Sequence, residues 1–142
     1  MTTQARPALS HYGLPMLTDL QQSLQQVAAK SQPLVLMVTL EGCAYCKLVR
    51  QNYLPEWLDK GLTILNLDMT SNAPMTDEAG RSTTHKLWAI RQRIRLAPTL
   101  LWLGTGGTEW VERLQGVSSR DFYGAYLNER MAESLRLARR SA

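Results

Sequence analysis

The two cysteines of this sequence, Cys43 and Cys46, constrain its fold more than any other feature. They follow directly on an apolar run at 34–40, and the residues after them continue in a helical pattern. A strand that leads into a Cys-x-x-Cys at the start of a helix is a redox-site arrangement. The first thiol then lies at a helix N-terminus, where free backbone N–H groups and the helix dipole favour the thiolate. We therefore predict that Cys43 is the attacking thiolate and that Cys46, more shielded, resolves the mixed disulfide.

Two other interpretations of the cysteine pair are inert buried thiols and half of a metal site. A zinc site needs four ligands, and only His11 and His85 could add nitrogen atoms. Neither histidine has the spacing of a zinc motif, and His85 is more simply a partly exposed residue in the first turn of its helix. We expect no metal and no cofactor other than the redox-active disulfide itself.

The bulk composition indicates one soluble globular domain. The chain has 142 residues, of which 44% are hydrophobic and 20% charged. Its formal net charge of +4 comes from arginines that we assign to solvated helix faces, and no nucleic-acid motif accompanies them. The longest apolar run is too short to span a bilayer, and the first ten residues contain no apolar core of a secretory signal. Either the protein is cytoplasmic or the numbering begins after a removed signal.

Apolar runs predict the strands of an α/β sheet. Residues 34–40 are apolar apart from one threonine, which is the pattern of a strand covered on both faces. Residues 62–68 predict the next strand, parallel to the first because a helical pattern separates them. Residues 99–103 predict a third strand, which a glycine-rich hairpin turn at 104–107 joins to a returning strand at 108–114.

Helical patterns surround these strands. Apolar residues at spacings of three and four predict a helix over 15–30, and the helix after the cysteines extends to residue 60, divided or kinked at Pro55. Two more helices should begin after capping residues, at Thr83 or Thr84 and at Ser118 or Ser119. The polar segments 1–13 and 69–82 indicate a flexible leader and a loop.

The order of these elements, with Cys43-Ala44-Tyr45-Cys46, Ala97-Pro98-Thr99 at a strand start and the glycine turn, resembles the thioredoxin fold over roughly residues 14–137. The resemblance implies a central mixed sheet of about four strands, helices on both faces and an N-terminal helical extension. Residues 1–13 would then be the leader and 14–142 the thioredoxin-like domain. In that family the proline is cis and packs beside the cysteine pair. Ala97, Pro98 and Thr99 are therefore expected at the substrate-binding surface, together with Ala44 and Tyr45.

The sequence is more similar to periplasmic thioredoxin-like proteins of bacteria than to cytosolic thioredoxin. Gly42 stands where thioredoxin has a tryptophan. A tyrosine directly before the second cysteine, here Tyr45, resembles the motif of disulfide isomerases, glutaredoxins and Sox-type thioredoxins. Met37 stands where thioredoxin has a buried aspartate. If a carboxylate assists proton transfer, Glu41 is the candidate. The resemblance favours a periplasmic location.

The resemblance implies a thiol–disulfide oxidoreductase that reduces protein disulfides. The expected partners are a protein disulfide substrate and a thiol electron-donor protein, with peripheral contact to a membrane reductase as a further candidate and no nucleic acid. We expect a monomer. The alternatives are a disulfide oxidase or isomerase, and a redox-gated binding module with little turnover.

Overall fold

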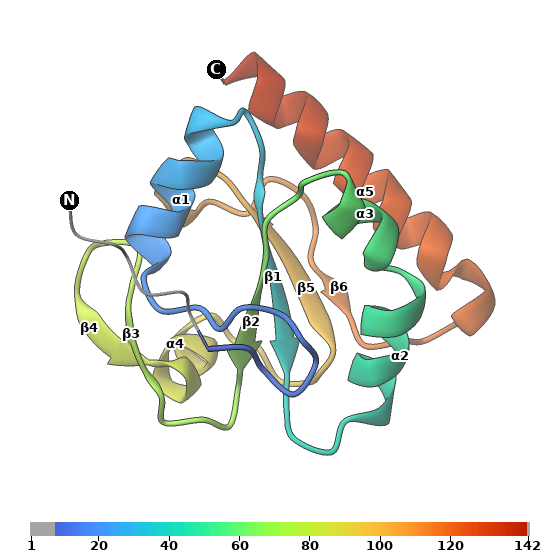
Figure 1. Ribbon diagram of the computed structural model, residues 1–142, viewed down its shortest axis with the longest axis horizontal. Helices are drawn as coiled ribbons and strands as arrows, with labels where there is room; N and C mark the ends of the chain where they lie inside the picture. The colour runs from blue at the N-terminus through green and yellow to red at the C-terminus, as the bar shows by residue number, and fades with distance from the viewer. Residues whose placement is uncertain (1–7, 142) are drawn as a thin grey trace.

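The computed structural model describes residues 8–141, which form a sheet covered by helices on both faces (Figure 1). The sheet has the strand order β2-β1-β5-β6. Its strands are β1 (Leu34–Thr39), β2 (Ile64–Asp68), β5 (Thr99–Leu103) and β6 (Leu114–Gln115). This is the predicted thioredoxin fold with a mixed four-stranded sheet. None of the helices in residues 8–141 is long and apolar enough to cross a membrane.

The apolar run around β1 forms the centre of the sheet, as predicted. All six residues of β1 are buried. The strand pairs in parallel with β2, for example Val35 with Ile64, and antiparallel with β5, for example Leu36 with Leu101. Because neighbouring side chains along a strand point to opposite faces, β1 contributes to two separate apolar clusters.

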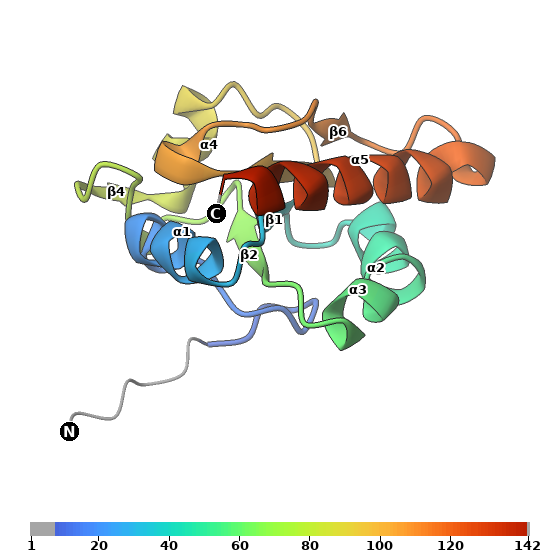
Figure 2. The same cartoon turned by 90° about the horizontal axis from the view of Figure 1, so that it is seen from above.

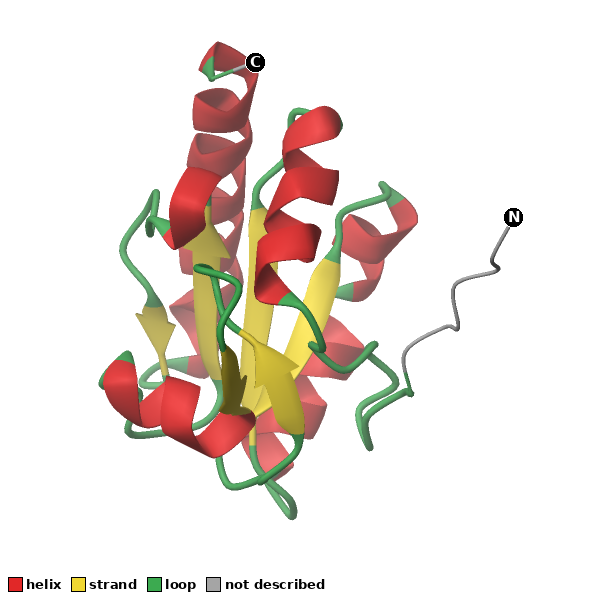
Figure 3. Cartoon of the chain, turned by 90° about the vertical axis from the view of Figure 1, so that its left-hand side faces the viewer, coloured by secondary structure: helices red, strands yellow, loops and turns green. Residues whose placement is uncertain are grey.

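One cluster lies between the sheet and helices α1 (Leu20–Ala29) and α4 (His85–Arg91), with the hairpin of β3 (Pro74–Thr76) and β4 (Ser82–Thr84) beside them (Figure 3). The other lies under α2 (Ala44–Asn52), α3 (Pro55–Asp59) and α5 (Arg120–Arg140). Figures 1 and 2 both show α2 and α3 on the side of the sheet opposite to α1. The predicted covering of both faces is confirmed.

The first helix is shorter than predicted, because it begins at Leu20 and not at residue 15. Asp19 caps it, accepting a hydrogen bond of 2.9 Å from the Gln22 N–H. The preceding residues instead follow the edge of β2, where the Leu17 N–H donates to the Asn66 carbonyl and the Asn66 N–H donates to the Pro15 carbonyl. An open sheet edge offers unpaired backbone groups, and pairing with them competed with helix formation.

The segment 69–82, predicted as a loop, contains β3 and leads into β4. The two strands pair antiparallel around a turn. The carboxylate of Asp77 closes this turn by accepting hydrogen bonds from the Ala79 and Arg81 N–H groups, and it also pairs with Arg91 of α4. The hairpin was not predicted because the segment is polar and its turn is stabilised by an aspartate side chain, which leaves no alternating apolar pattern in the sequence.

The returning strand at 108–114 was also predicted too long. A short 3-10 turn at Thr105–Gly107 leads to a single bridge between Leu103 and Glu109, and regular pairing resumes only at β6. Trp110 packs directly over Gly104, where a Cβ atom would come within 1.7 Å of the indole ring. The Gly104 N–H donates to the Thr108 carbonyl and the Trp110 N–H to the Trp102 carbonyl, so backbone contact with β5 continues here without a regular strand.

Other boundaries agree with the predictions. Pro55 begins α3 and separates it from α2, and the Thr84 hydroxyl caps α4 by accepting from the Leu87 N–H. Ser119 precedes α5, although its side chain makes no capping hydrogen bond. Part of the expected leader, residues 1–7, lies outside the described residues, whereas Tyr12 in the described part contacts the cysteine loop.

Candidate active site

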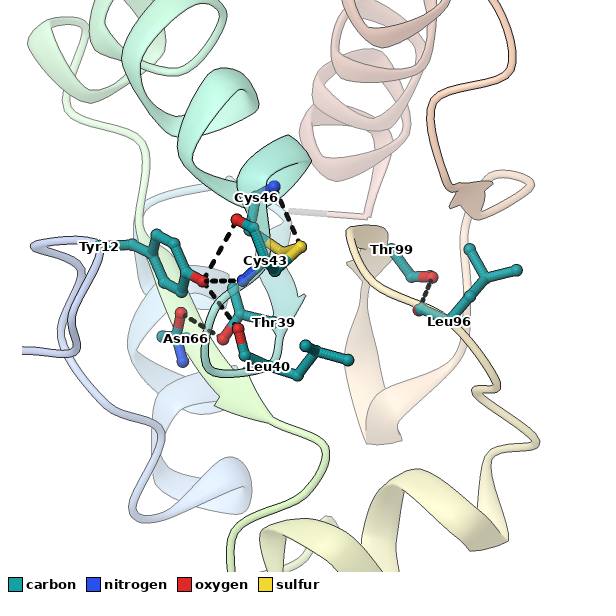
Figure 4. The surroundings of a disulfide bond; sticks show 8 residues. All are labelled: Tyr12, Thr39, Leu40, Cys43, Cys46, Asn66, Leu96 and Thr99. Atoms are coloured by element: carbon teal, nitrogen blue, oxygen red, sulfur yellow. Dashed lines mark hydrogen bonds between the residues drawn. A yellow bond between two sulfur atoms is a disulfide. The ribbon is translucent and has the colours of Figure 1, made fainter.

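Cys43 and Cys46 form a disulfide at the start of α2, at the end of the sheet where β1 stops. Their Cα atoms are 5.2 Å apart. Cys43 is the N-cap of α2, and its sulfur accepts a hydrogen bond of 3.1 Å from the Cys46 N–H (Figure 4). Cys43 is partly exposed, whereas Cys46 is fully buried at 0%. The first sulfur therefore occupies the predicted helix N-terminus, and the second is the shielded one.

Gly42 connects β1 to α2 through a sharp turn. Its φ of +75° lies in the left-handed region that residues with a Cβ rarely adopt. Open space surrounds the position where its Cβ would be. The backbone angle is therefore the reason that glycine suits the position where thioredoxin has a tryptophan.

The loop before β5 lies across from the disulfide. The Ala97–Pro98 peptide bond is cis, in line with the resemblance. Ala97 and Cys43 pack against the same apolar cluster. Pro98 is buried, and its carbonyl accepts a 2.7 Å hydrogen bond from the Gly116 N–H. Val38 near the end of β1 pairs with Thr99 at the start of β5, so the fold brings the cysteine pair and this loop to the same end of the sheet.

The remaining predicted substrate-binding residues differ in exposure. Ala44 is exposed and the Tyr45 side chain is 50% exposed, so both are accessible beside the disulfide. Thr99 is only 1% exposed, and its hydroxyl donates to the Leu96 carbonyl at 2.7 Å (Figure 4). The Thr99 side chain therefore closes the loop and faces the interior.

Tyr12 is a site residue that the sequence analysis missed. Its hydroxyl donates to the Leu40 carbonyl at 2.7 Å and accepts from the Cys43 N–H at 3.3 Å (Figure 4). It therefore ties the end of β1 to the first residue of the Cys-x-x-Cys. The available signal was a lone tyrosine in a polar segment, which becomes informative only when the fold places it beside the cysteine loop.

The apolar cluster that surrounds Cys46 contains no carboxylate from the described residues. Met37 is buried in the same cluster as Cys46. Asp77 is the only buried carboxylate among residues 8–141, and it belongs to the hairpin on the opposite face of the sheet. A backbone N–H of Arg81 and the Arg91 guanidinium, among other donors, hold the pKa of Asp77 below its usual value. Glu41 is exposed and lines the same groove as Cys43.

His85 is buried, and this corrects the expectation of a partly exposed histidine. It is 1% exposed. Its Nδ1 accepts from the Asp68 N–H at 3.1 Å, and its Nε2 lies 2.7 Å from the Leu17 carbonyl, which requires the proton on Nε2. Burial lowers the pKa of His85, although its contact with Leu17 and the nearby Asp68 charge oppose this. In the described part of the chain no three His, Cys, Asp or Glu residues are grouped as a metal site would require.

A family model described as a thioredoxin-like domain matches residues 20–130. The chain belongs to this family. No curated protein matches the sequence. The family and the disulfide-bonded Cys-x-x-Cys of this thioredoxin-like domain together support a thiol–disulfide oxidoreductase.

Solved thioredoxin structures share the fold at low sequence identity. Periplasmic thioredoxin SoxS from Paracoccus pantotrophus is 19% identical, with a TM-score of 0.50, over 72% of this chain and 98% of that chain. Thioredoxin O2 from Arabidopsis thaliana is 16% identical, with a TM-score of 0.54, over 89% and 97%. Mitochondrial thioredoxin 3 from Saccharomyces cerevisiae is 14% identical, with a TM-score of 0.54, over 82% and 94%.

Proposed function

We propose that this thioredoxin-like domain reduces protein disulfides through Cys43 and Cys46. The observation that carries the proposal is the unequal exposure of a bonded cysteine pair at a helix N-terminus, with Cys43 accessible and Cys46 buried. In the reduced protein the backbone N–H groups and dipole of α2 favour a thiolate on Cys43. Tyr45, which is exposed, and Ala97, which is partly exposed, offer surface for the substrate chain.

The reaction proceeds by two thiol–disulfide exchanges. The Cys43 thiolate attacks one sulfur of the substrate disulfide, so that a Cys43–substrate bond forms and the substrate S–S bond breaks. The first substrate thiolate leaves and takes a proton. Cys46, deprotonated, then attacks the Cys43 sulfur and releases the second substrate thiolate. Two electrons pass from the dithiol to the substrate, leaving Cys43 and Cys46 oxidised.

The proton of Cys46 has no buried carboxylate to accept it, because Met37 occupies the strand position where thioredoxin has an aspartate. Glu41, exposed on the groove that Cys43 also lines, is the candidate for this proton transfer. Glu41→Gln would then slow the resolving step and shift its pH dependence, whereas a solvent-exposed bystander would leave both as they are.

Insulin reduction tests the assignment directly. With dithiothreitol as electron donor, the wild-type protein should accelerate precipitation of the insulin B chain. Cys43→Ala should reduce the rate to that of dithiothreitol alone, because no accessible attacking thiol remains. Retained activity in Cys43→Ala would contradict the assignment.

The direction of electron flow is decided by the reduction potential of the Cys43–Cys46 pair. A value near about −270 mV, as in thioredoxin, supports a reductase, whereas a value near about −120 mV supports an oxidase. Equilibration with glutathione buffers of known ratio, followed by alkylation of the free thiols, measures it. Slow, stoichiometric reaction with every disulfide tested would instead favour a redox-gated binding module.

We further propose that the protein acts as a monomer in the periplasm, receives electrons from a thiol protein, and requires neither metal nor organic cofactor. The structural neighbour from Paracoccus pantotrophus, which is named a periplasmic thioredoxin, supports the location. Fractionation of cells that express the native gene tests the compartment, and sedimentation of the purified protein tests the oligomeric state.

A further inference from the structure

A groove of about 730 Å³ lies beside Cys43, between α2 and the N-terminal segment. His11 and Tyr12 line one side of it, and Lys47 and Arg50 line the side formed by α2. Tyr12 and Cys43 are shown together in Figure 4. The volume falls within the range of roughly 300–1,000 Å³ that is usual for small-molecule sites. The groove can therefore hold a small ligand in contact with the reactive end of α2.

The charge that lines this groove is mainly positive. Lys47 and Arg50 are three residues apart on α2, so they project from the same face of the helix. The N-terminus of α2, at Cys43, adds the positive end of the helix dipole. Glu41 is the one acidic residue in the lining, and the ion pairs among residues 8–141 do not include Glu41, Lys47 or Arg50.

Arg50 is the most informative of these residues, because it is half-buried and has no partner among the described residues. The other half-buried arginines of the described chain, Arg113 and Arg130, each bind a carboxylate and a backbone carbonyl. Arg50 makes no hydrogen bond or ion pair within residues 8–141, and its Nε atom is enclosed without an acceptor. Because solvent does not reach Nε, a ligand in the groove would bind the two terminal nitrogens of the guanidinium, which also have no hydrogen-bond or ion-pair partner among residues 8–141.

The Arg50 side chain extends from α2 to the N-terminal segment. Its stem comes from the second turn of α2, and one terminal nitrogen lies 3.8 Å from the point where a Cβ on Gly13 would stand. Arg50 therefore reaches from α2 to the turn of the N-terminal segment. Side chains on a helix lean toward its N-terminus, which directs Lys47 and Arg50 toward the Cys43 end of the groove.

We propose that this groove binds the carboxylate of a small disulfide substrate and that Arg50 is the residue that recognises it. The inference rests on the proposed disulfide reduction and adds the substrate class. A planar guanidinium binds a carboxylate through two parallel hydrogen bonds, which suits the unpartnered Arg50. The disulfide of the same ligand then lies at Cys43.

The two thiols of Cys43 and Cys46 supply both electrons that the reduction of such a substrate needs. The Cys43 thiolate attacks the nearer sulfur of the small disulfide, forming a mixed disulfide and releasing one thiolate, which takes a proton from water. Cys46 then displaces the second thiolate and closes the Cys43–Cys46 bond. The small disulfide gains two electrons, and the protein loses two.

A matched pair of substrates tests the proposal in single turnover. Dithiodibutyrate carries a carboxylate on each arm, and its bis-amide has the same shape without the charge. The pre-reduced protein, freed from reductant, is mixed with each compound, quenched with acid and alkylated, and the remaining thiols are counted by mass spectrometry. The ratio of the two rate constants, acid over amide, reports recognition of the carboxylate within each variant.

The wild-type protein should prefer the acid, and Arg50→Gln should lower the ratio roughly tenfold, the order expected when one hydrogen bond between charged groups is lost. Arg139→Gln is the control, because it removes the same charge from an exposed position near the end of α5. Its ratio should equal that of the wild type.

The outcomes separate this inference from the function on which it rests. Reduction of the amide by the wild-type protein supports the dithiol chemistry. If a protein that reduces insulin reduces neither compound, the small-disulfide substrate is overturned and the proposed function stands. If insulin is not reduced either, the proposed function fails as well. Reduction of both at equal rates overturns the carboxylate site alone. An equal fall in the ratio for Arg50→Gln and Arg139→Gln also overturns it, because the preference would then arise from the overall charge. Thermal melts confirm that both variants are folded.

Discussion

At the scale of single residues, the chemistry depends on the different surroundings of two identical side chains. Cys43 caps a helix and is partly exposed, whereas Cys46 lies in an apolar cluster that also contains Met37. A helix N-terminus favours an anion, whereas apolar burial disfavours one. The spacing of the two cysteines is enough to predict which one attacks and which one resolves.

Cys46→Ala should trap the substrate on Cys43. The attacking thiol remains, but the second exchange cannot take place, so the mixed disulfide accumulates. Non-reducing electrophoresis after incubation with reduced variant and oxidised substrate should show a covalent complex that dithiothreitol dissolves. If Cys46→Ala turns over at the wild-type rate without a trapped complex, Cys46 is not the resolving residue.

Tyr12→Phe should loosen the cysteine loop without removing packing volume. The variant loses the hydrogen bonds to the Leu40 carbonyl and from the Cys43 N–H, and the free energy of unfolding should fall by about 1 kcal/mol. Hydrogen exchange of the Cys43 amide should become faster than that of other amides. A uniform loss of stability would instead speed the exchange of all protected amides. Tyr126→Phe changes an exposed tyrosine with no side-chain hydrogen bond among the described residues and serves as the control.

At the scale of elements, His85 joins three segments that are distant in sequence. It stands at the start of α4, accepts from the Asp68 N–H at the end of β2 and contacts the Leu17 carbonyl before α1. Both ring nitrogens are used by the neutral form. Protonation of Nδ1 would remove the acceptor that His85 offers to the Asp68 N–H, so the junction depends on pH.

The stability of the protein should therefore fall in mild acid. Burial lowers the pKa of His85 in the folded protein, so the unfolded chain binds the proton first as the pH drops below about 6.5. The stabilising contribution is complete above that pH and is lost toward the lower folded pKa. Urea unfolding at pH 7.5 and pH 5 should show a smaller difference for His85→Gln than for the wild type. Lys86→Gln, at the next and exposed position, should retain the wild-type difference.

At the scale of the whole molecule, the redox state of the cysteine pair is coupled to folding. A disulfide with a low reduction potential is one that the folded state stabilises, whereas a strong oxidant has a more stable reduced form. For the proposed reductase, the oxidised protein should unfold at a higher urea concentration than the reduced protein. The reverse order would favour the oxidase.

Features of the fold that depend on neighbouring residues could be predicted from the sequence, whereas features that depend on distant contacts could not. Cys43, Cys46 and the buried central strand follow from local patterns, namely an apolar run and a helix start. These features are local because each depends on neighbours within one turn or one strand. The role of the Ala97–Pro98 loop is implied by the resemblance to thioredoxin-like proteins. The hairpin at β3 and β4 and the late start of α1 depend on distant partners, namely Arg91 and the open edge of β2.

The cysteine pair and the main strands and helices could be read from the sequence, because thiol spacing and hydrophobic periodicity act over a few residues. Only the assembled fold shows that Tyr12 holds the Cys43 loop, that His85 is buried, and that Arg50 lies in a groove beside the disulfide without a partner among residues 8–141. Each of these depends on contacts across many residues of chain, and such contacts exist only when the sheet and its helices have assembled.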